Sequence, residues 1–262
     1  MSDLCLAKWY VDAIGPRGEA TVGYHVELRW RALSVRLAGV TVLPEDGPPA
    51  SRLTLRGARA PRLDPESGEL RWRSEPLGLD GVWRPVAPRL DERLYEGPSG
   101  AVDWRCLMPA ARVELGAGGA RAPAWGYAER LELTLPPWRL PIEGLRWGRF
   151  VGEGASLVWI DWTGSHSRRL LALDGRRLPP GEIGEARVAS ADGSVELRLV
   201  RHRALREAAL RDTLGGLAPS LLGKLPERLL GLTERKWIAR GTLSAGGRSF
   251  EGWALHEQVH WP

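Results

Sequence analysis

Three carboxylates stand on the apolar faces of segments that alternate with the two-residue period of a β-strand. Each shares its face with aromatic or aliphatic residues: Glu129 with Tyr127 and Leu131, Asp161 with Leu157 and Trp159, and Glu257 with Leu255 and Val259. A buried carboxylate is costly unless it is hydrogen-bonded, paired with arginine or protonated, and burial favours the protonated form of a general acid. Glu129 and Asp161 are therefore candidate catalytic residues, one donating a proton while the other acts as base or positions a water.

Tryptophan is the second unusual feature, because the chain contains 13 tryptophans against two phenylalanines and two methionines. A rigid aromatic wall binds extended apolar ligands and stabilises a developing carbocation through its ring faces, although any single tryptophan is more often part of a plain core. We expect aromatic side chains to line the ligand and polar ones to orient it. The candidate ligand contacts are Tyr24, Trp104, Trp125, Tyr127, Trp147, Arg149, Trp159 and Glu257.

Other catalytic templates are absent from the sequence. It contains no GxSxG, P-loop or HExxH motif, and the glycines of Gly116–Gly119 lack the strand–helix context of a dinucleotide site. Cys5 and Cys106 are not part of a CxxC motif. His256 and His260 share a strand face, which leaves only a weak metal pair open. We therefore expect neither a cofactor nor a resident metal.

Short strands must position these residues. The 32 glycines and 20 prolines indicate frequent turns, and segments such as Ala20–Trp30 and Tyr127–Leu135 alternate apolar and polar residues. The pattern predicts an all-β fold of antiparallel strands. Residues Arg203–Leu232 differ, because leucine and alanine recur there at helical spacing, and Pro219 and Pro226 would divide the segment into short helices. This helical insertion is predicted either to cap a barrel end or to act as an amphipathic lid that touches a ligand entrance or a membrane surface.

The length of 262 residues suits one large β-domain or two smaller ones. The linker-like stretch Gly116–Pro123 predicts a boundary that divides the chain into domains 1–118 and 119–262. The net charge of +5 arises from 37 basic and 32 acidic residues that are spread along the chain, which disfavours nucleic acid as a partner. The sequence shows neither a signal-peptide pattern nor a long apolar run, so we expect a cytoplasmic protein.

Four short motifs carry a resemblance to a known family: Lys8–Ala13 (KWYVDA), Trp125–Glu129 (WGYAE), Trp147–Phe150 (WGRF) and Leu157–Asp161 (LVWID). Together they resemble carotenoid 1,2-hydratase (hydroxyneurosporene synthase) and AttH-like proteins, and more distantly tocopherol cyclase. The resemblance implies two lipocalin-like antiparallel β-barrels in tandem, and cofactor-independent proteins that protonate, hydrate or fold polyene-like substrates. The chain departs from the family at Lys8, where a Glu-Trp-Trp-Tyr type of run is usual, and at Ala128–Arg130, where a His/Asn-rich version is usual.

Three functions of different classes remain open. The first is a cofactor-independent lyase or isomerase, of hydratase or cyclase type, acting on a terpenoid or polyene in the junction between two barrels. The second is a non-catalytic carrier of a lipid, pigment or other small apolar ligand, in which the acids pair with Arg149 or Arg105. The third is a stress or scaffold protein that uses the helical insertion as its partner surface. A carboxylate without an arginine partner favours the first function, and one held by arginine favours the second.

Overall fold

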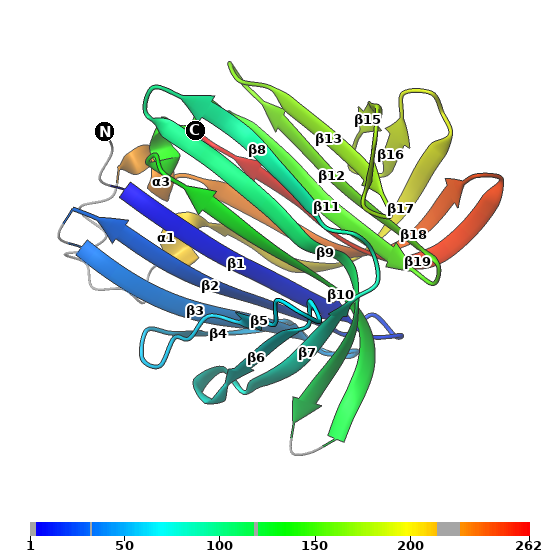
Figure 1. Cartoon of the computed structure of the whole chain (residues 1–262), viewed down its shortest axis with the longest axis horizontal. Coiled ribbons are helices and arrows are strands. Elements are labelled where there is room, and N and C mark those ends of the chain that lie inside the picture. The colour runs from blue at the N-terminus through cyan, green and yellow to red at the C-terminus, as the bar shows by residue number, and fades with distance from the viewer. Residues whose placement is uncertain (1–3, 32, 118–119, 214–225) are drawn as a thin grey trace. The chain divides into compact units, whose positions relative to one another are not determined.

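The computed structural model describes residues 4–31, 33–117, 120–213 and 226–262, and this part of the chain is almost entirely antiparallel β-structure (Figure 1). It forms two compact units. One runs through Pro136 and includes Asp174–Arg176, and the other comprises Pro137–Leu173 and Arg177–Pro262.

The N-terminal unit is built on a ten-stranded sheet in the order β4-β3-β2-β1-β10-β9-β7-β6-β5, with β8 paired to β9. Its elements are β1 (Leu4–Ile14), β2 (Ala20–Trp30), β3 (Leu33–Leu43), β4 (Ala50–Thr54), β5 (Arg62–Leu63), β6 (Leu70–Ser74), the 3-10 helix η1 (Glu75–Leu77), β7 (Leu79–Pro85), β8 (Leu90–Gly97), β9 (Gly100–Ala117) and β10 (Ala120–Leu133). The first strand pairs with the last, β1 with β10, as in an up-and-down β-barrel.

The C-terminal unit repeats this arrangement in a nine-stranded sheet of order β14-β13-β12-β11-β19-β18-β17-β16-β15, so that β11 pairs with β19. Its elements are η2 (Pro137–Arg139), β11 (Gly144–Gly152), β12 (Ala155–Thr163), β13 (Arg168–Leu173), β14 (Arg176–Leu178), β15 (Pro180–Ile183), β16 (Arg187–Ser190), β17 (Val195–Ala209), α1 (Leu210–Thr213), α3 (Glu227–Leu230), β18 (Thr233–Ala245) and β19 (Arg248–His260). The predicted fold of two lipocalin-like antiparallel barrels in tandem is confirmed.

Two predicted boundaries need correction. The division between residues 118 and 119 falls inside the β9–β10 hairpin, where Ala117 pairs with Ala120, and the compact units divide instead after Pro136. Small residues suit a hairpin turn as well as a linker, so their composition alone did not separate the two. The helical insertion begins at Leu210, because residues up to Ala209 pair with β18.

Two short helices of that insertion, α1 and α3, are present, and its residues 214–225 lie outside the described part of the chain. None of the helices that the structure describes combines the length and the apolar character needed to cross a membrane.

Strand alternation gives each sheet a tightly packed inner face. In the N-terminal unit the core cluster includes Val11, Trp72, Met108 and Ala128. In the C-terminal unit it includes Phe150, Leu157, Trp159, Leu197 and Ala254. Residues next to these in sequence point to the opposite face of the same sheet. Each candidate site residue can therefore be assigned to the core face or to the opposite face.

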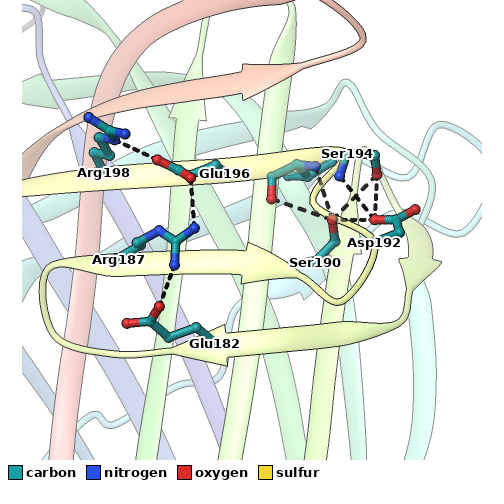
Figure 2. Close-up of polar contacts among 8 residues, drawn as sticks. Glu182, Arg187, Ser190, Asp192, Ser194, Glu196 and Arg198 are labelled. Carbon is teal, nitrogen blue, oxygen red and sulfur yellow. Dashed lines mark hydrogen bonds and ion pairs between the residues drawn. The ribbon is translucent and has the colours of Figure 1, made fainter.

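A polar network stabilises the edge of the C-terminal sheet at β15, β16 and β17 (Figure 2). Arg187 bridges Glu182 and Glu196 with N–O distances of 2.5 and 2.8 Å. At the following turn Asp192 accepts hydrogen bonds from the hydroxyls of Ser190 and Ser194, at 2.6 and 2.8 Å. Asp192 thus satisfies the polar groups of a tight turn and Arg187 joins neighbouring strands, so these contacts have a structural role.

Candidate functional site

Glu129 lies on the face of the N-terminal sheet that is opposite the core cluster. In the strand register it stands between Tyr10 of β1 and Cys106 of β9. Its chain neighbour Ala128 points into the core instead. The sequence prediction that Glu129 shares a face with Tyr127 and Leu131 therefore agrees with the structure, but that face is not the inner face of the barrel.

Two hydrogen bonds hold the Glu129 carboxylate. Its Oε2 accepts one from Nε1 of Trp104 at 2.5 Å and one from the hydroxyl of Tyr127 at 2.6 Å. Glu129 is 9% exposed, whereas Trp104 is 2% and Tyr127 0% exposed. Glu129 is thus the most exposed of three buried residues, and both of its donors belong to the packed sheet.

Burial sets the protonation of the groups around this carboxylate. It raises the pKa of the Tyr127 hydroxyl well above its usual value, and Cys106 and Glu129 raise that pKa further. Burial also raises the pKa of the Cys106 thiol well above its usual value. Both groups therefore stay protonated at neutral pH, so that Tyr127 faces Glu129 as a hydrogen-bond donor.

Three residues of this cluster were not singled out from the sequence: Tyr10, Asp12 and Cys106. The ring of Tyr10 meets that of Tyr127 edge-on at 6.1 Å between centroids, and the fully buried Asp12 stands opposite Tyr127 in the β1–β10 register. The alternation that revealed Glu129 also places Asp12 on one face with Tyr10, so the same test applied to the first strand would have found both. Cys106 could be assigned only from the register of β9 against β10.

The remaining predicted contacts of the N-terminal unit lie on the Glu129 face but at different distances along it. Tyr24 stands beside Tyr10 in the β1–β2 register, and its ring packs over Gly39, where a side chain would collide with it. Trp125 lies four positions before Glu129 in β10, and the guanidinium of Arg112 sits 3.7 Å from its ring centroid. Tyr24 is thus part of the Glu129 cluster, whereas Trp125 is occupied by a cation–π contact.

Asp161 of the C-terminal unit has arginine neighbours at both oxygens. Arg146 Nη1 lies 3.8 Å from Oδ2 and Arg169 Nε lies 3.5 Å from Oδ1. These arginines are its cross-strand neighbours in β11 and β13. The predicted partners were others: Arg149 stands opposite Val158 on the other face of the sheet, and Arg105 pairs with Glu132. This geometry gives Asp161 a structural ion-pair role.

Trp159 shares the inner face with Asp161 and is part of the core. Its ring lies across Gly148, where a Cβ would come within 2.2 Å of the indole and 2.8 Å of the His256 Cβ. His256 in turn stacks on Trp237 with 5.2 Å between ring centroids. The absence of a side chain at Gly148 therefore makes room for a packed aromatic layer, in which Trp159 is 1% exposed.

Trp147, Arg149 and Glu257 lie on the opposite face of this sheet from Trp159. Trp147 stands opposite Glu257 in the register, and Arg149 is fully buried with Nη1 3.4 Å from the carbonyl oxygen of Trp253. Glu257 forms an ion pair with Lys236 at 2.7 Å. The C-terminal candidates are thus split between two faces of one sheet and do not form one cluster.

The Glu129 cluster is the arrangement best suited to chemistry. It combines a buried carboxylate, two hydrogen-bond donors and an aromatic surrounding, an arrangement that can accept and return a proton. Among the residues that the structure describes, no group of three or more histidine, cysteine, aspartate or glutamate side chains is placed to hold a metal ion.

Comparison with known proteins gives a likeness of fold. No protein-family model matches the chain, and no curated protein matches it. Among solved structures, CghA with Sch210972 shares 15% identity at a TM-score of 0.63, covering 100% of this chain and 89% of that chain. NE1406 from Nitrosomonas europaea, assigned as an AttH, shares 15% at 0.59, covering 97% and 92%. Kievitone hydratase from Nectria haematococca shares 12% at 0.56, covering 97% and 88%. The predicted resemblance to AttH-like proteins is confirmed at the level of the fold.

Proposed function

We propose that this protein is a cofactor-independent lyase or isomerase of a small apolar molecule, terpenoid or polyene-like, in which Glu129 moves the proton. The observation that carries the proposal is the buried Glu129 carboxylate, whose Oε2 accepts hydrogen bonds from Trp104 and Tyr127. The shared fold with kievitone hydratase supports it as an analogy. Asp161, which has arginines at both oxygens, is assigned to stability.

The two donors decide the resting state of the carboxyl group. Hydrogen bonds from an indole N–H and a phenol O–H to one oxygen stabilise the carboxylate, because they favour the charged form. Tyr127 keeps its proton, since burial raises its pKa. We propose that Glu129 starts the reaction as a base and becomes the proton donor of the following step, which adds to the role expected from its burial alone.

The atoms and electrons balance without a co-reactant. Glu129 takes a proton from a carbon of the ligand, and the C–H bonding pair becomes part of a π system. In an isomerase the protonated Glu129 exchanges its proton with solvent and then protonates a different carbon, so that the double bond has moved and the product formed in D2O carries deuterium. In a hydro-lyase the electron pair expels hydroxide from the adjacent carbon, and that hydroxide takes the proton from Glu129 and leaves as water. The reverse sequence hydrates a double bond.

Deuterium incorporation tests this assignment without knowledge of the substrate. An organic extract of host cells would be incubated with the protein in D2O and analysed by mass spectrometry for compounds that gain deuterium or change by the mass of one water. We expect the wild-type protein and an Asp161→Asn variant to produce the same changes. A Glu129→Gln variant, which keeps size and hydrogen-bonding capacity, should produce none.

Circular dichroism and thermal unfolding would show that each variant is folded, and Glu129→Asp provides a second variant that retains the acid. If a folded Glu129→Gln variant incorporated as much deuterium as the wild-type protein, the proposal would be overturned.

The carrier alternative is favoured by one observation, namely that the Glu129 carboxylate already has two hydrogen-bond donors. A carrier would retain compounds from the extract and change none of them.

A further inference from the structure

Lys8 lies on the same face of the N-terminal sheet as Glu129. In the register of β1 it stands between Val26 and Leu131, and Tyr10, two residues further along, stands directly opposite Glu129. Side chains diagonally across an antiparallel pair are separated by about 7–8 Å. The Lys8 and Glu129 side chains are therefore diagonal neighbours on one surface.

The surroundings of Lys8 are apolar and only partly covered. Val26 and Leu131 flank it, and both are partly exposed, as Lys8 itself is. Its ammonium group lies 5.8 Å from the centroid of the Tyr10 ring. An accessible apolar surface with a cation at its centre is suited to an amphipathic ligand.

Among the described residues no carboxylate forms an ion pair with the ammonium group of Lys8, and its cation–π contact is with the Tyr10 ring. Lys236 shows the contrast, because its ammonium lies 2.9 Å from Glu234 and 2.7 Å from Glu257. The chain also uses lysine sparingly, at positions 8, 224 and 236 only. A cation beside apolar side chains and without a counter-ion favours an anionic partner.

From this arrangement we infer that Lys8 binds an anionic oxygen of the substrate, and that the substrate is an apolar molecule with a carboxylate or an acidic enol. This inference rests on the proposed function, because it names the substrate class of the Glu129 site. The apolar part of the molecule lies against Val26 and Leu131, and the carbon that exchanges its proton with Glu129 is a few bonds away from the anionic group. Lys8 is a binding residue that sets the position of the substrate along the face.

Two pairs of probes test the inference: retinoic acid and cis-parinaric acid, each compared with its methyl ester. Both molecules have a polyene chain, and within each pair the acid and the ester differ mainly in the charge of the head group. Quenching of the tryptophan fluorescence measures binding. We expect wild-type protein to bind at least one acid about tenfold more tightly than its ester, as for a charge-assisted contact at a partly buried site.

Variants of Lys8 locate the preference. Lys8→Gln should reduce the acid-to-ester ratio of affinities to about one, as the charge-assisted contact is lost. Lys8→Arg should retain most of the ratio, because it keeps the positive charge. Thermal unfolding of each variant would show that the side chain, and not the fold, is responsible. A wild-type protein without acid preference for either probe, or a Lys8→Gln variant that keeps the wild-type ratio, would overturn the inference.

Glu129→Gln separates this inference from the proposed function. That variant should keep the acid preference while losing deuterium incorporation. If it loses incorporation but Lys8→Gln keeps the acid preference, the substrate class is wrong and the catalytic assignment stands. If Lys8→Gln abolishes the preference but Glu129→Gln still incorporates deuterium, the binding assignment stands and the catalytic one is wrong.

Discussion

Trp104 of β9 and Glu129 of β10 form a hydrogen bond of 2.5 Å between the indole Nε1 and Oε2, in a part of the sheet where the indole is 2% exposed. A second buried indole gives a matched comparison, because Nε1 of Trp83 donates at 2.8 Å to the backbone carbonyl of Asp12. One bond ends on an ionisable carboxyl group and the other on a neutral carbonyl. Hydrogen bonds to charged acceptors stabilise proteins by about 1.5–3 kcal/mol and neutral ones by about 0.5–1.5 kcal/mol.

We therefore predict that Trp104→Phe lowers the free energy of unfolding by more than Trp83→Phe does. Both substitutions remove a similar volume from a packed site, so that the difference of about 1 kcal/mol reports the charge of the acceptor. Urea unfolding followed by circular dichroism at neutral pH measures both. An equal or smaller cost at Trp104 would show that Oε2 is not a charged acceptor there.

His25 predicts a dependence of stability on pH. Both ring nitrogens are buried in the N-terminal core face, and desolvation lowers the pKa of the imidazole below 6.5, with a smaller lowering by Arg36 and opposing effects of Glu27 and the Ala58 backbone. A group whose pKa is lower in the folded state binds its proton first in the unfolded chain. Stability is therefore highest above the unfolded pKa, and falls as the pH decreases from about 6.5 towards the folded pKa.

The variant His25→Leu isolates this effect, because leucine keeps an apolar core side chain and cannot titrate. The free energy of unfolding of the wild-type protein, measured relative to that of the variant, should decrease between about pH 8 and about pH 5. A constant difference over that range would contradict the prediction, and an increasing one would indicate that the imidazole gains a partner when protonated.

The sequence predicted the faces of these residues better than it predicted their partners. Alternation with a period of two placed Asp161 correctly with Trp159, since side chains of a strand must point to alternate sides. The partner of Asp161 depends on which residues of β11 and β13 stand opposite it, and turn lengths set that register. Arg146 stands opposite Asp161, whereas Arg149 lies three positions further along β11, opposite Val158, and this odd offset points it to the other face.

Helical spacing failed for a related reason. Leu205, Ala208 and Ala209 fit a helix when they are considered alone, yet these residues belong to β17 and pair with β18. Interstrand pairing satisfies the backbone groups and overrides the weak local preference of leucine and alanine for helices. The sequence also did not predict that Glu129 lies on the outer face of the N-terminal sheet. Alternation separates the two faces of a strand without showing which one encloses the core.

Asp192 predicts a second effect of pH, at the turn that joins β16 and β17 (Figure 2). The hydroxyl of Ser190 and the backbone N–H and hydroxyl of Ser194 lower the pKa of Asp192 to about 2. Because this folded-state pKa lies below the unfolded value, its contribution is present above about pH 4 and is lost as the pH falls towards 2. Asp192→Asn should lower the melting temperature at neutral pH and leave it nearly unchanged in strong acid. Glu66→Gln is a matched control on another turn, with no expected change at either pH.

The buried ion cluster of the C-terminal unit yields the last prediction. Burial lowers the pKa of the Lys236 ammonium, but Glu234 and Glu257 raise it more, and the net effect is an increase. Lys236→Met would leave Glu257 without this cation and Glu234 with Arg206, 3.5 Å away, among its ion-pair partners, and breaking a buried pair in this way costs about 3–5 kcal/mol. Adding Glu257→Gln removes one of these charges, so the double variant should be more stable than Lys236→Met alone.

The stability of Lys236→Met should also rise on mild acidification, as a carboxylate takes up a proton. Urea unfolding at two pH values measures both effects, and additive losses with no acid rescue would show that the three side chains are not coupled.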